Sequence, residues 1–180
     1  MINRIHILGA SGSGTSTLGK ELADRLSFKH FDTDDYFWLP PKQSFTHKRE
    51  KEDRQQLLMK DLTSTDKWVL SGSLTDWGDI FIPLFDVVIY LWIPKEIRMQ
   101  RLAEREKQRY GEAINPGGSK YNQYIEFMDW AERYDDAGKD MRSKALHNEW
   151  LSKIECQVIR IEENMSTDER ISKILLELDI

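Results

Sequence analysis

A glycine-rich stretch near the start of the chain has the residue types and the spacing of a phosphate-binding loop. It follows an apolar run at residues 5–8 and precedes a helix-like run at residues 18–26. A strand, a glycine-rich turn and a helix in this order allow backbone N–H groups to point at a phosphate. The candidate nucleotide-binding residues are Gly9, Ser11, Gly12, Ser13, Gly14, Thr15, Ser16 and Thr17.

This loop departs from the pattern G-x-x-x-x-G-K-[ST] at one position, because Thr15 stands where the pattern has lysine. Threonine cannot supply the positive charge that the lysine brings to the phosphates. Ser16 keeps the position from which a hydroxyl reaches Mg²⁺. The loop therefore predicts nucleotide binding, with the missing charge either supplied from elsewhere in the chain or lost.

Two carboxylates lie at the end of the second expected strand, residues 29–32. Because ligands of open α/β sheets bind at the carboxyl ends of strands, Asp32 or Asp34 could hold Mg²⁺ through water or accept a substrate proton. Either residue could instead cap the next helix. Trp38 could stack on a base or cover the core. Asp32, Asp34 and Trp38 are candidate substrate-binding residues, and Asp34 is a candidate metal ligand together with Ser16.

A third expected strand, residues 68–71, ends at Gly72. A glycine at this point would allow a substrate to approach the backbone closely, so Gly72 is a further candidate substrate-binding residue. A plain turn at the end of a strand explains the same glycine equally simply.

Arginines recur at steps of three and four after the fourth expected strand, at positions 98, 101, 105 and 109, so they share one helix face. Such a row is ordinarily a solvated helix face. Arginine is also the side chain best suited to clamp a transferring phosphoryl group. The candidate catalytic residues are Arg101, Arg105, Arg109 and, beyond a break at residues 115–118, Arg133.

The elements that must position these residues alternate between short β-branched runs and longer helical runs, which indicates βαβ units around a parallel sheet. Strands are expected at residues 4–8, 29–32, 68–71, 86–92 and 157–161. Helices are expected from the glycine loop to residue 26, at about 46–62, from 94 onward, at 121–134 and at 167–178, the last capped by Ser166 or Thr167. Two long inserts remain, at residues 33–66 and 94–155.

Composition narrows the class of protein. The chain has 180 residues, and 26 lysines and arginines against 31 aspartates and glutamates give a net charge of −5, which argues against a general nucleic-acid binder. The longest apolar run, residues 85–93, is far shorter than the ~20 residues of a membrane helix. One cysteine, and no basic-then-apolar pattern at the N-terminus, favour a cytoplasmic protein without a membrane partner.

The order of these features resembles that of the P-loop nucleoside monophosphate kinases. It is especially similar to an adenylate-kinase-like bacterial subgroup, also described as topology-modulation-like kinases. The residues that carry the resemblance are 9–17, 32–38, 68–73, Arg101-Leu102-x-x-Arg105 and Arg133-Tyr134-Asp135-Asp136, of which the last two look like patterns that flank a lid. Thr15 departs from the family pattern, and so does Ser71, which stands where these kinases usually place an aspartate that contacts Mg²⁺.

The resemblance implies a three-layer α/β P-loop NTPase fold with a five-stranded parallel sheet ordered 2-3-1-4-5. It implies one domain over residues 1–180, with a substrate-binding arm at about 35–65 and a lid at about 106–132. The expected activity is an ATP- and Mg²⁺-dependent phosphotransferase that acts on a small molecule, first of all a nucleoside monophosphate, as a monomer or a homodimer.

Two alternatives stay open at this point. The Asp32-x-Asp34 spacing is similar to that of shikimate-kinase-like enzymes, which favours a hydroxylated metabolite such as shikimate or gluconate as the acceptor. The departures at Thr15 and Ser71 favour a nucleotide-binding regulatory protein that does not catalyse.

Overall fold

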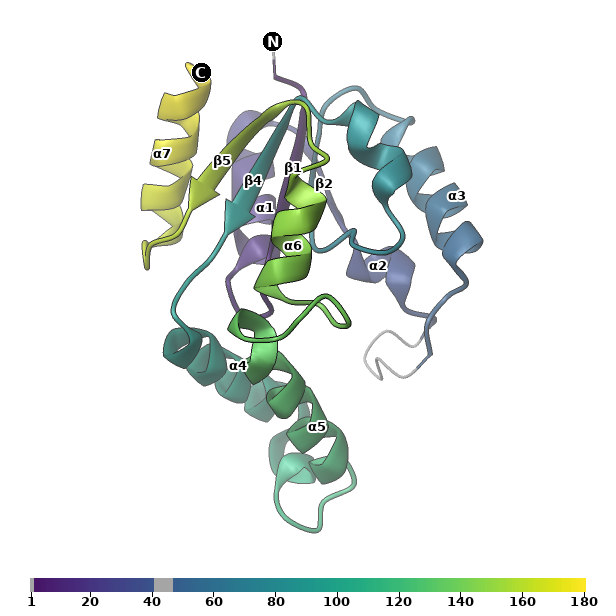
Figure 1. Cartoon of the computed structure of the whole chain (residues 1–180), viewed down its shortest axis with the longest axis vertical. Helices are drawn as coiled ribbons and strands as arrows, with labels where there is room; N and C mark the ends of the chain where they lie inside the picture. The colour runs from purple at the N-terminus through teal and green to yellow at the C-terminus, as the bar shows by residue number, and fades with distance from the viewer. Residues whose placement is uncertain (1, 41–46) are drawn as a thin grey trace.

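The computed structural model describes residues 2–40 and 47–180, and a five-stranded parallel sheet forms its centre (Figure 1). The strands lie in the order β2-β3-β1-β4-β5. They are β1 (Arg4–Gly9), β2 (Lys29–Asp32), β3 (Trp68–Ser71), β4 (Val87–Leu91) and β5 (Gln157–Ile161). The predicted sheet and its order are confirmed. The bounds of β2, β3 and β5 are as predicted, and those of β1 and β4 differ by one residue at one or both ends.

Both faces of the sheet are buried, because successive apolar side chains of each strand point to opposite sides. In β1, Ile5 and Ile7 join the core on one face and Leu8 joins the core on the other. In β4, Ile89 and Tyr90 divide in the same way. Nearly continuous apolar strands of this kind are typical of parallel sheets that helices cover on both faces.

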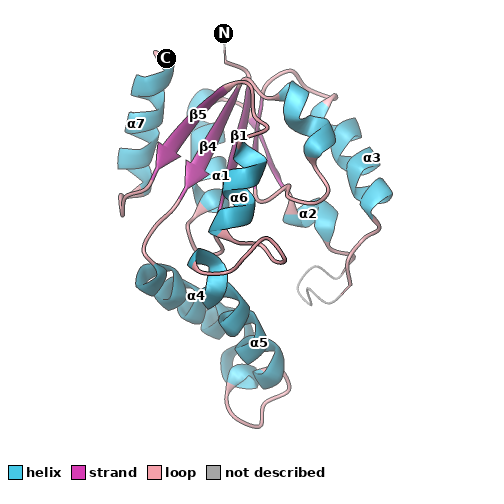
Figure 2. Cartoon of the chain, viewed as in Figure 1, coloured by secondary structure: helices cyan, strands magenta, loops and turns pink. Residues whose placement is uncertain are grey.

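Helices form the two outer layers (Figure 2). On one face, α1 (Thr15–Leu26) and α7 (Thr167–Leu178) pack Leu18 and Ile171 into a shared core. On the other, α3 (Lys51–Leu62), α6 (Lys144–Leu151) and the 3₁₀ segment η2 (Asp79–Leu84) contribute Leu58, Trp150 and Phe81. The result is the predicted three-layer arrangement.

The start of α7 is fixed by a capping box. The Ser166 hydroxyl accepts a hydrogen bond from the Glu169 backbone N–H at 3.3 Å, and the Glu169 carboxylate accepts one from the Ser166 N–H at 2.7 Å. Reciprocal bonds of this type satisfy two donors that the first turn of a helix leaves open. Ser166, rather than Thr167, is therefore the cap.

The insert after β4 extends beyond the carboxyl edge of the sheet (Figure 1). It consists of α4 (Lys95–Tyr110), η3 (Gly111–Ile114), α5 (Tyr121–Glu132) and η4 (Arg133–Asp135), and then the chain returns to α6. Helices α4 and α5 pack against each other, and the predicted break at residues 115–118 separates η3 from α5. We call residues 95–135 the α4–α5 arm.

The main helix of the insert between β2 and β3 is shorter than predicted. A short helix, α2 (Asp34–Phe37), follows β2, and α3 begins at Lys51 rather than near residue 46, which lies outside the described residues. Residues 47–50 are not helical, since Lys48 forms an isolated antiparallel bridge with Trp38. This bridge holds the start of the insert against the end of α2.

Candidate functional site

The glycine-rich loop joins β1 to α1 at the carboxyl edge of the sheet. Gly12 and Gly14 have φ angles of 81° and 92°, which glycine adopts without strain. A side chain at Gly9 would overlap the Leu91 carbonyl oxygen, so glycine is also required where β1 meets β4. The Ser13 N–H donates to the Ala10 carbonyl at 3.1 Å and closes the turn.

The first turn of α1 offers its backbone to a ligand. Gly14 occupies the cap position and no side chain caps the helix, so the N–H groups that begin α1 lack the partners a capping residue would give them. Ser16 and Thr17 are exposed here, and Thr15 is half-buried. Uncapped N–H groups and the positive end of the helix dipole together make an anion site.

The carboxyl edge of β2 carries the two predicted carboxylates. Asp32 accepts a hydrogen bond from the Ser71 hydroxyl at 3.1 Å, and the His30 ring nitrogen Nε2 lies 2.9 Å from the same hydroxyl. The Asp34 N–H donates to Asp32 Oδ1 at 3.0 Å, so Asp32 also caps the first turn of α2. The capping alternative therefore holds for Asp32, whose remaining lone pairs stay open to a ligand.

Asp34 opens into a large cavity. Its side chain is accessible to solvent, yet enclosure by the cavity walls and then the neighbouring Asp32 charge raise its pKa above the ordinary value. Arg142, a hydrogen bond from Trp38 and Arg105 act in the opposite direction. A carboxylate that lies in a cavity, and whose pKa is shifted by enclosure and by neighbouring charges, is typical of a functional site.

The cavity has a volume of about 810 Å³, which is large enough for a nucleotide-sized ligand. It extends from Ser11 of the glycine loop past α2 and α3 to the α4–α5 arm. Its walls combine aromatic rings with cations: Phe37, Trp38, Trp77, Tyr110, Tyr124, Phe127 and Trp130, with Lys48, Lys51, Arg54, Arg105, Arg109, Lys120 and Arg142. Aromatic faces suit a base, and arginine suits phosphate oxygens.

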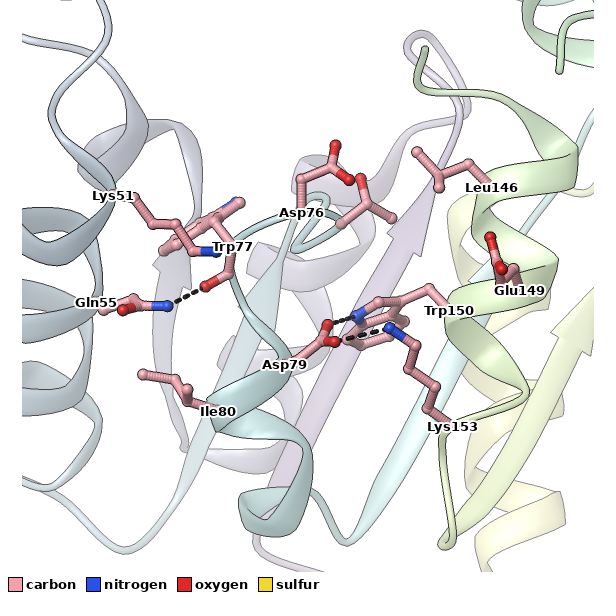
Figure 3. A pocket seen from close by; sticks show the side chains of 11 residues that line it. Lys51, Gln55, Asp76, Trp77, Asp79, Ile80, Leu146, Glu149, Trp150 and Lys153 are labelled. Carbon is pink, nitrogen blue, oxygen red and sulfur yellow. Dashed lines mark hydrogen bonds and ion pairs between the residues drawn. The ribbon is translucent and has the colours of Figure 1, made fainter. Parts of the chain in front are cut away.

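A smaller pocket of about 190 Å³ adjoins the cavity and shares Lys51, Thr75, Asp76 and Trp77 with it (Figure 3). Its polar groups are largely satisfied within the protein. Asp79 accepts hydrogen bonds from Trp150 Nε1 at 2.8 Å and from Lys153 Nζ at 2.7 Å (Figure 3). The larger cavity, which reaches the glycine loop and Asp34, is therefore the candidate site.

The predicted arginine row divides along α4. Arg98 is fully buried and forms an ion pair with Asp135 of η4. Arg101 is exposed and lies 3.5 Å from the Asn164 side-chain oxygen, in the loop after β5. The structure therefore does not place Arg101 on the cavity wall, because one face of a long helix meets several different neighbours along its length.

Arg105 and Arg109 do line the cavity. Both bind the buried carboxylate of Glu106, with Arg105 Nη2 at 2.9 Å and Arg109 Nη1 at 3.4 Å from Oε1. The Arg105 guanidinium also lies 5.5 Å from the centre of the Phe127 ring on α5. These contacts orient two cations toward the same space.

Two predicted residues lie away from this space. Arg133 is exposed and does not line the cavity, and Thr33 fills the position in front of Gly72. A side chain at residue 72 would overlap Thr33 Oγ1, and φ is 108° there, so this glycine accommodates the loop after β2 rather than a ligand. Arg133 begins η4 and points outward, whereas the next residue, Tyr134, points into the core.

Arg142 takes the place expected for Arg133, and sequence reasoning missed it. It lines the cavity in the loop before α6, with its guanidinium 5.6 Å from the centre of the Trp130 ring. Burial lowers its pKa, while Asp34, Tyr134 and Asp76 raise it. It belongs to no recognisable spacing, and its position depends on how the chain returns from the α4–α5 arm.

Buried hydrogen bonds connect this return to the cavity wall. Tyr134 Oη bonds both Tyr90 Oη at 2.9 Å and His147 Nδ1 at 2.8 Å. His147 Nε2 lies 3.1 Å from the Ser73 hydroxyl, which bonds the Thr75 hydroxyl at 2.9 Å. Burial lowers the pKa of His147 to about 3, so the ring is neutral near pH 7. The network fixes η4 and α6 against the loop after β3.

The donor set also fits Mg²⁺, which takes oxygen ligands and usually binds through one or two protein groups together with substrate phosphates. Ser16 supplies a hydroxyl, and Asp32 and Asp34 supply carboxylates at the same edge of the sheet. Across residues 2–40 and 47–180, no three His, Cys, Asp or Glu side chains cluster as a cage for a metal. Over the same ranges, no helix is long and apolar enough to cross a membrane.

A model of the protein family described as AAA domain matches residues 5–129, which span the glycine loop, the first four strands and most of the α4–α5 arm. The chain belongs to this family. Membership supports a P-loop kinase domain, a coarser assignment than the adenylate-kinase-like subgroup.

Relatives of this AAA domain protein include kinases of small molecules. It is 51% identical over 97% of its length to an uncharacterised protein, YqaC, of Bacillus subtilis (strain 168), of which the match covers 97%. It is 30% identical over 69% of its length to the cytidylate kinase of Haloarcula marismortui, of which the match covers 72%. The fold is similar to that of a crystal structure of shikimate kinase from Bacteroides thetaiotaomicron, with a TM-score of 0.61, 16% identity and full coverage of both chains.

Proposed function

We propose that this protein transfers a phosphoryl group from ATP to a nucleoside monophosphate. The observation that carries the proposal is one cavity that joins Ser11 of the glycine loop to Asp34 and to four arginines, between aromatic walls. P-loop kinases act on small molecules with ATP and Mg²⁺, and a cytidylate kinase is among the relatives. Rings that can stack on a base, next to cations that can bind phosphates, suit a nucleotide acceptor.

The roles follow from the placement of each group. Backbone N–H groups of the glycine loop and of the first turn of α1 bind the ATP phosphates. Ser16 with Asp32 or Asp34 would hold Mg²⁺, which would supply positive charge to the phosphates. Asp34 orients the acceptor, and Arg105, Arg109 and Arg142 stabilise the charge of the transferring group. No covalent nucleophile is required, because positioning and electrostatics dominate phosphoryl transfer.

The α4–α5 arm is the element that closes on the nucleotides. It carries Arg105 and Arg109 beyond the sheet edge, so a rotation of the arm toward α2 and α3 would bring both cations onto the phosphates and exclude water. The insert between β2 and β3, with α2 and α3, forms the opposite wall and binds the acceptor. We therefore propose a lid at about residues 106–132 and a substrate-binding arm at about residues 35–65, of which 41–46 lie outside the described residues.

The test is release of ADP from ATP·Mg²⁺ in the presence of each nucleoside monophosphate, with shikimate and gluconate in parallel. We expect release with at least one nucleoside monophosphate and none with the two metabolites. An Asp34→Asn variant, which keeps the size of the side chain and removes its charge, should lose most of the activity. Release with shikimate or gluconate alone would overturn the nucleotide acceptor.

A regulatory role without catalysis is the second candidate, and Thr15 favours it because the loop lacks its usual cation. In that case the wild-type protein binds ATP and releases no ADP with any acceptor. Binding of ATP measured by calorimetry in the same samples separates this result from an inactive preparation.

A further inference from the structure

Arg170, in the first turn of α7, lies against the glycine loop from the far end of the sequence. Its guanidinium Nη1 donates a hydrogen bond to the Ser13 carbonyl oxygen at 2.9 Å. The same nitrogen lies 3.3 Å from the point where a side chain at Gly14 would begin. Only 3% of Arg170 is exposed. A cation is therefore enclosed directly beside the loop whose own lysine is replaced by Thr15.

Among the described residues, no acidic side chain pairs with the Arg170 guanidinium. Nε and Nη2 of Arg170 are buried and have no hydrogen-bond partner there, and no ion pair to Arg170 is formed. Burial, and then the positive charge of Arg101, lower the pKa of Arg170. A buried charge without a partner destabilises the folded state, so a group that neutralises this cation on binding would be favoured.

One further positive contribution reaches the same point. Helix α1 begins beside Gly14 and presents the positive end of its dipole there, with no side-chain cap and no acidic residue in its first turn, whereas Asp168 and Glu169 already balance the start of α7. The uncapped start of α1 and an arginine that forms no ion pair leave an excess of positive potential. An anion is the ligand that such a site would bind most strongly.

We propose that Arg170 replaces the missing loop lysine: Nη1 holds the Ser13 carbonyl while Nε and Nη2 bind an oxygen of the nucleotide phosphate chain. The proposal rests on the proposed function, since it assumes that the glycine loop binds a nucleotide. It explains how a loop with Thr15 keeps a positive charge, and why a buried arginine lacks a carboxylate partner: the phosphate chain is the partner. Arg170 is thus a substrate-contacting residue supplied by the last helix.

The experiment compares binding of ATP by wild-type protein, Arg170→Met, and Arg25→Met as a matched control with an exposed arginine at the other end of α1. Methionine keeps the length of the stem and removes the charge. We expect Arg170→Met to weaken ATP binding at least tenfold and Arg25→Met to change it less than twofold. Tripolyphosphate, which has a phosphate chain and no base, should raise the melting temperature of wild-type protein and not that of Arg170→Met.

A second pair of variants separates charge from loop structure. Thr15→Lys in the Arg170→Met background should restore ATP binding to within about threefold of wild type, because it returns a cation to the loop. Arg170→Lys should retain intermediate binding and serves as the test if the methionine variant does not fold. Without ligand, Arg170→Met should melt no lower than wild type, since it removes an uncompensated buried charge.

Three results would overturn the proposal: equal ATP affinity of Arg170→Met and wild type, a lower melting temperature of ligand-free Arg170→Met with no rescue by Thr15→Lys, or wild-type affinity for tripolyphosphate in Arg170→Met. The first of these would leave the proposed function standing. Failure of wild-type protein to bind ATP would instead contradict the proposed function itself.

Discussion

Ser71 and Asp32 are directly paired across β3 and β2, and the Ser71 hydroxyl donates a hydrogen bond to Asp32 Oδ2 at 3.1 Å. P-loop kinases usually carry an acid at the end of the third strand, where this chain has serine. The pairing places the carboxylate of the neighbouring strand beside that position and holds it by the serine hydroxyl. The acid is therefore present at the sheet edge, but it is supplied by β2.

Ser71→Ala should reduce activity through the position of Asp32. The change removes the hydrogen bond to the carboxylate and leaves His30 Nε2 without its partner. We therefore expect the free energy of unfolding to fall by about 1 kcal/mol. It should also raise the Mg²⁺ concentration needed for half-maximal ADP release severalfold. Urea unfolding and a Mg²⁺ titration measure the two effects, with the exposed Ser64→Ala as control. An unchanged Mg²⁺ dependence would contradict the metal role of Asp32.

Loss of both cavity arginines should abolish turnover. Arg105→Ala with Arg109→Ala removes the cations placed to neutralise the transferring group, and we expect kcat to fall by about 10³-fold or more. The double change also leaves the buried Glu106 carboxylate unpaired, which destabilises the fold.

Adding Glu106→Gln separates the two effects of that double change. The triple variant should recover most of the melting temperature and none of the activity. Steady-state ADP release and thermal unfolding of the same samples provide the comparison. Activity that returns along with stability would assign both arginines a structural role only.

Arg142 and Arg133 form a matched pair for testing the cavity. Arg142→Ala removes a cation that lines the cavity beside Asp34 and should lower kcat/KM by at least tenfold. Arg133→Ala changes an exposed residue outside the cavity and should stay within about twofold of wild type. Equal losses in the two variants, measured with the acceptor that gives most ADP release, would show that η4 moves Arg133 into the site on closure.

Acid should destabilise the protein through two buried histidines. Burial lowers the pKa of His6 and of His147 to about 3, below the ordinary 6.5. As the pH falls, both histidines therefore bind protons in the unfolded chain before they do so in the folded protein. The free energy of unfolding decreases as pH falls from about 6.5 toward 3. At pH 5 the loss is about 2 kcal/mol for each histidine.

His6→Asn tests this pH dependence, because asparagine keeps a donor for the Leu70 carbonyl, which His6 Nδ1 contacts at 3.1 Å, and does not titrate. Between pH 7.5 and pH 5, its free energy of unfolding should fall about 2 kcal/mol less than that of wild type. Urea unfolding at both pH values measures the difference. The same decrease in both proteins would show that His6 is protonated in the folded state.

Local signals in the sequence determined the sheet, the glycine loop and the ends of the last helix. The bounds of β2, β3 and β5 were predicted to the residue, three glycines after a buried strand predicted the turn, and Ser166 or Thr167 marked the start of α7. These features depend on residues within a few positions of one another. Periodicity and capping can therefore predict them without knowledge of the fold.

Only the tertiary structure decided which side chains share the site. Helical spacing placed four arginines on one face of α4, but their neighbours differ along the helix. Arg98 pairs with Asp135, and Arg101 contacts Asn164. Only Arg105 and Arg109 line the cavity. Arg142 arrives with the return from the α4–α5 arm. Arg170 meets Ser13 across 157 positions of sequence. Contacts of this kind follow from the packing of elements that are distant in the sequence, and local residue spacing does not predict them.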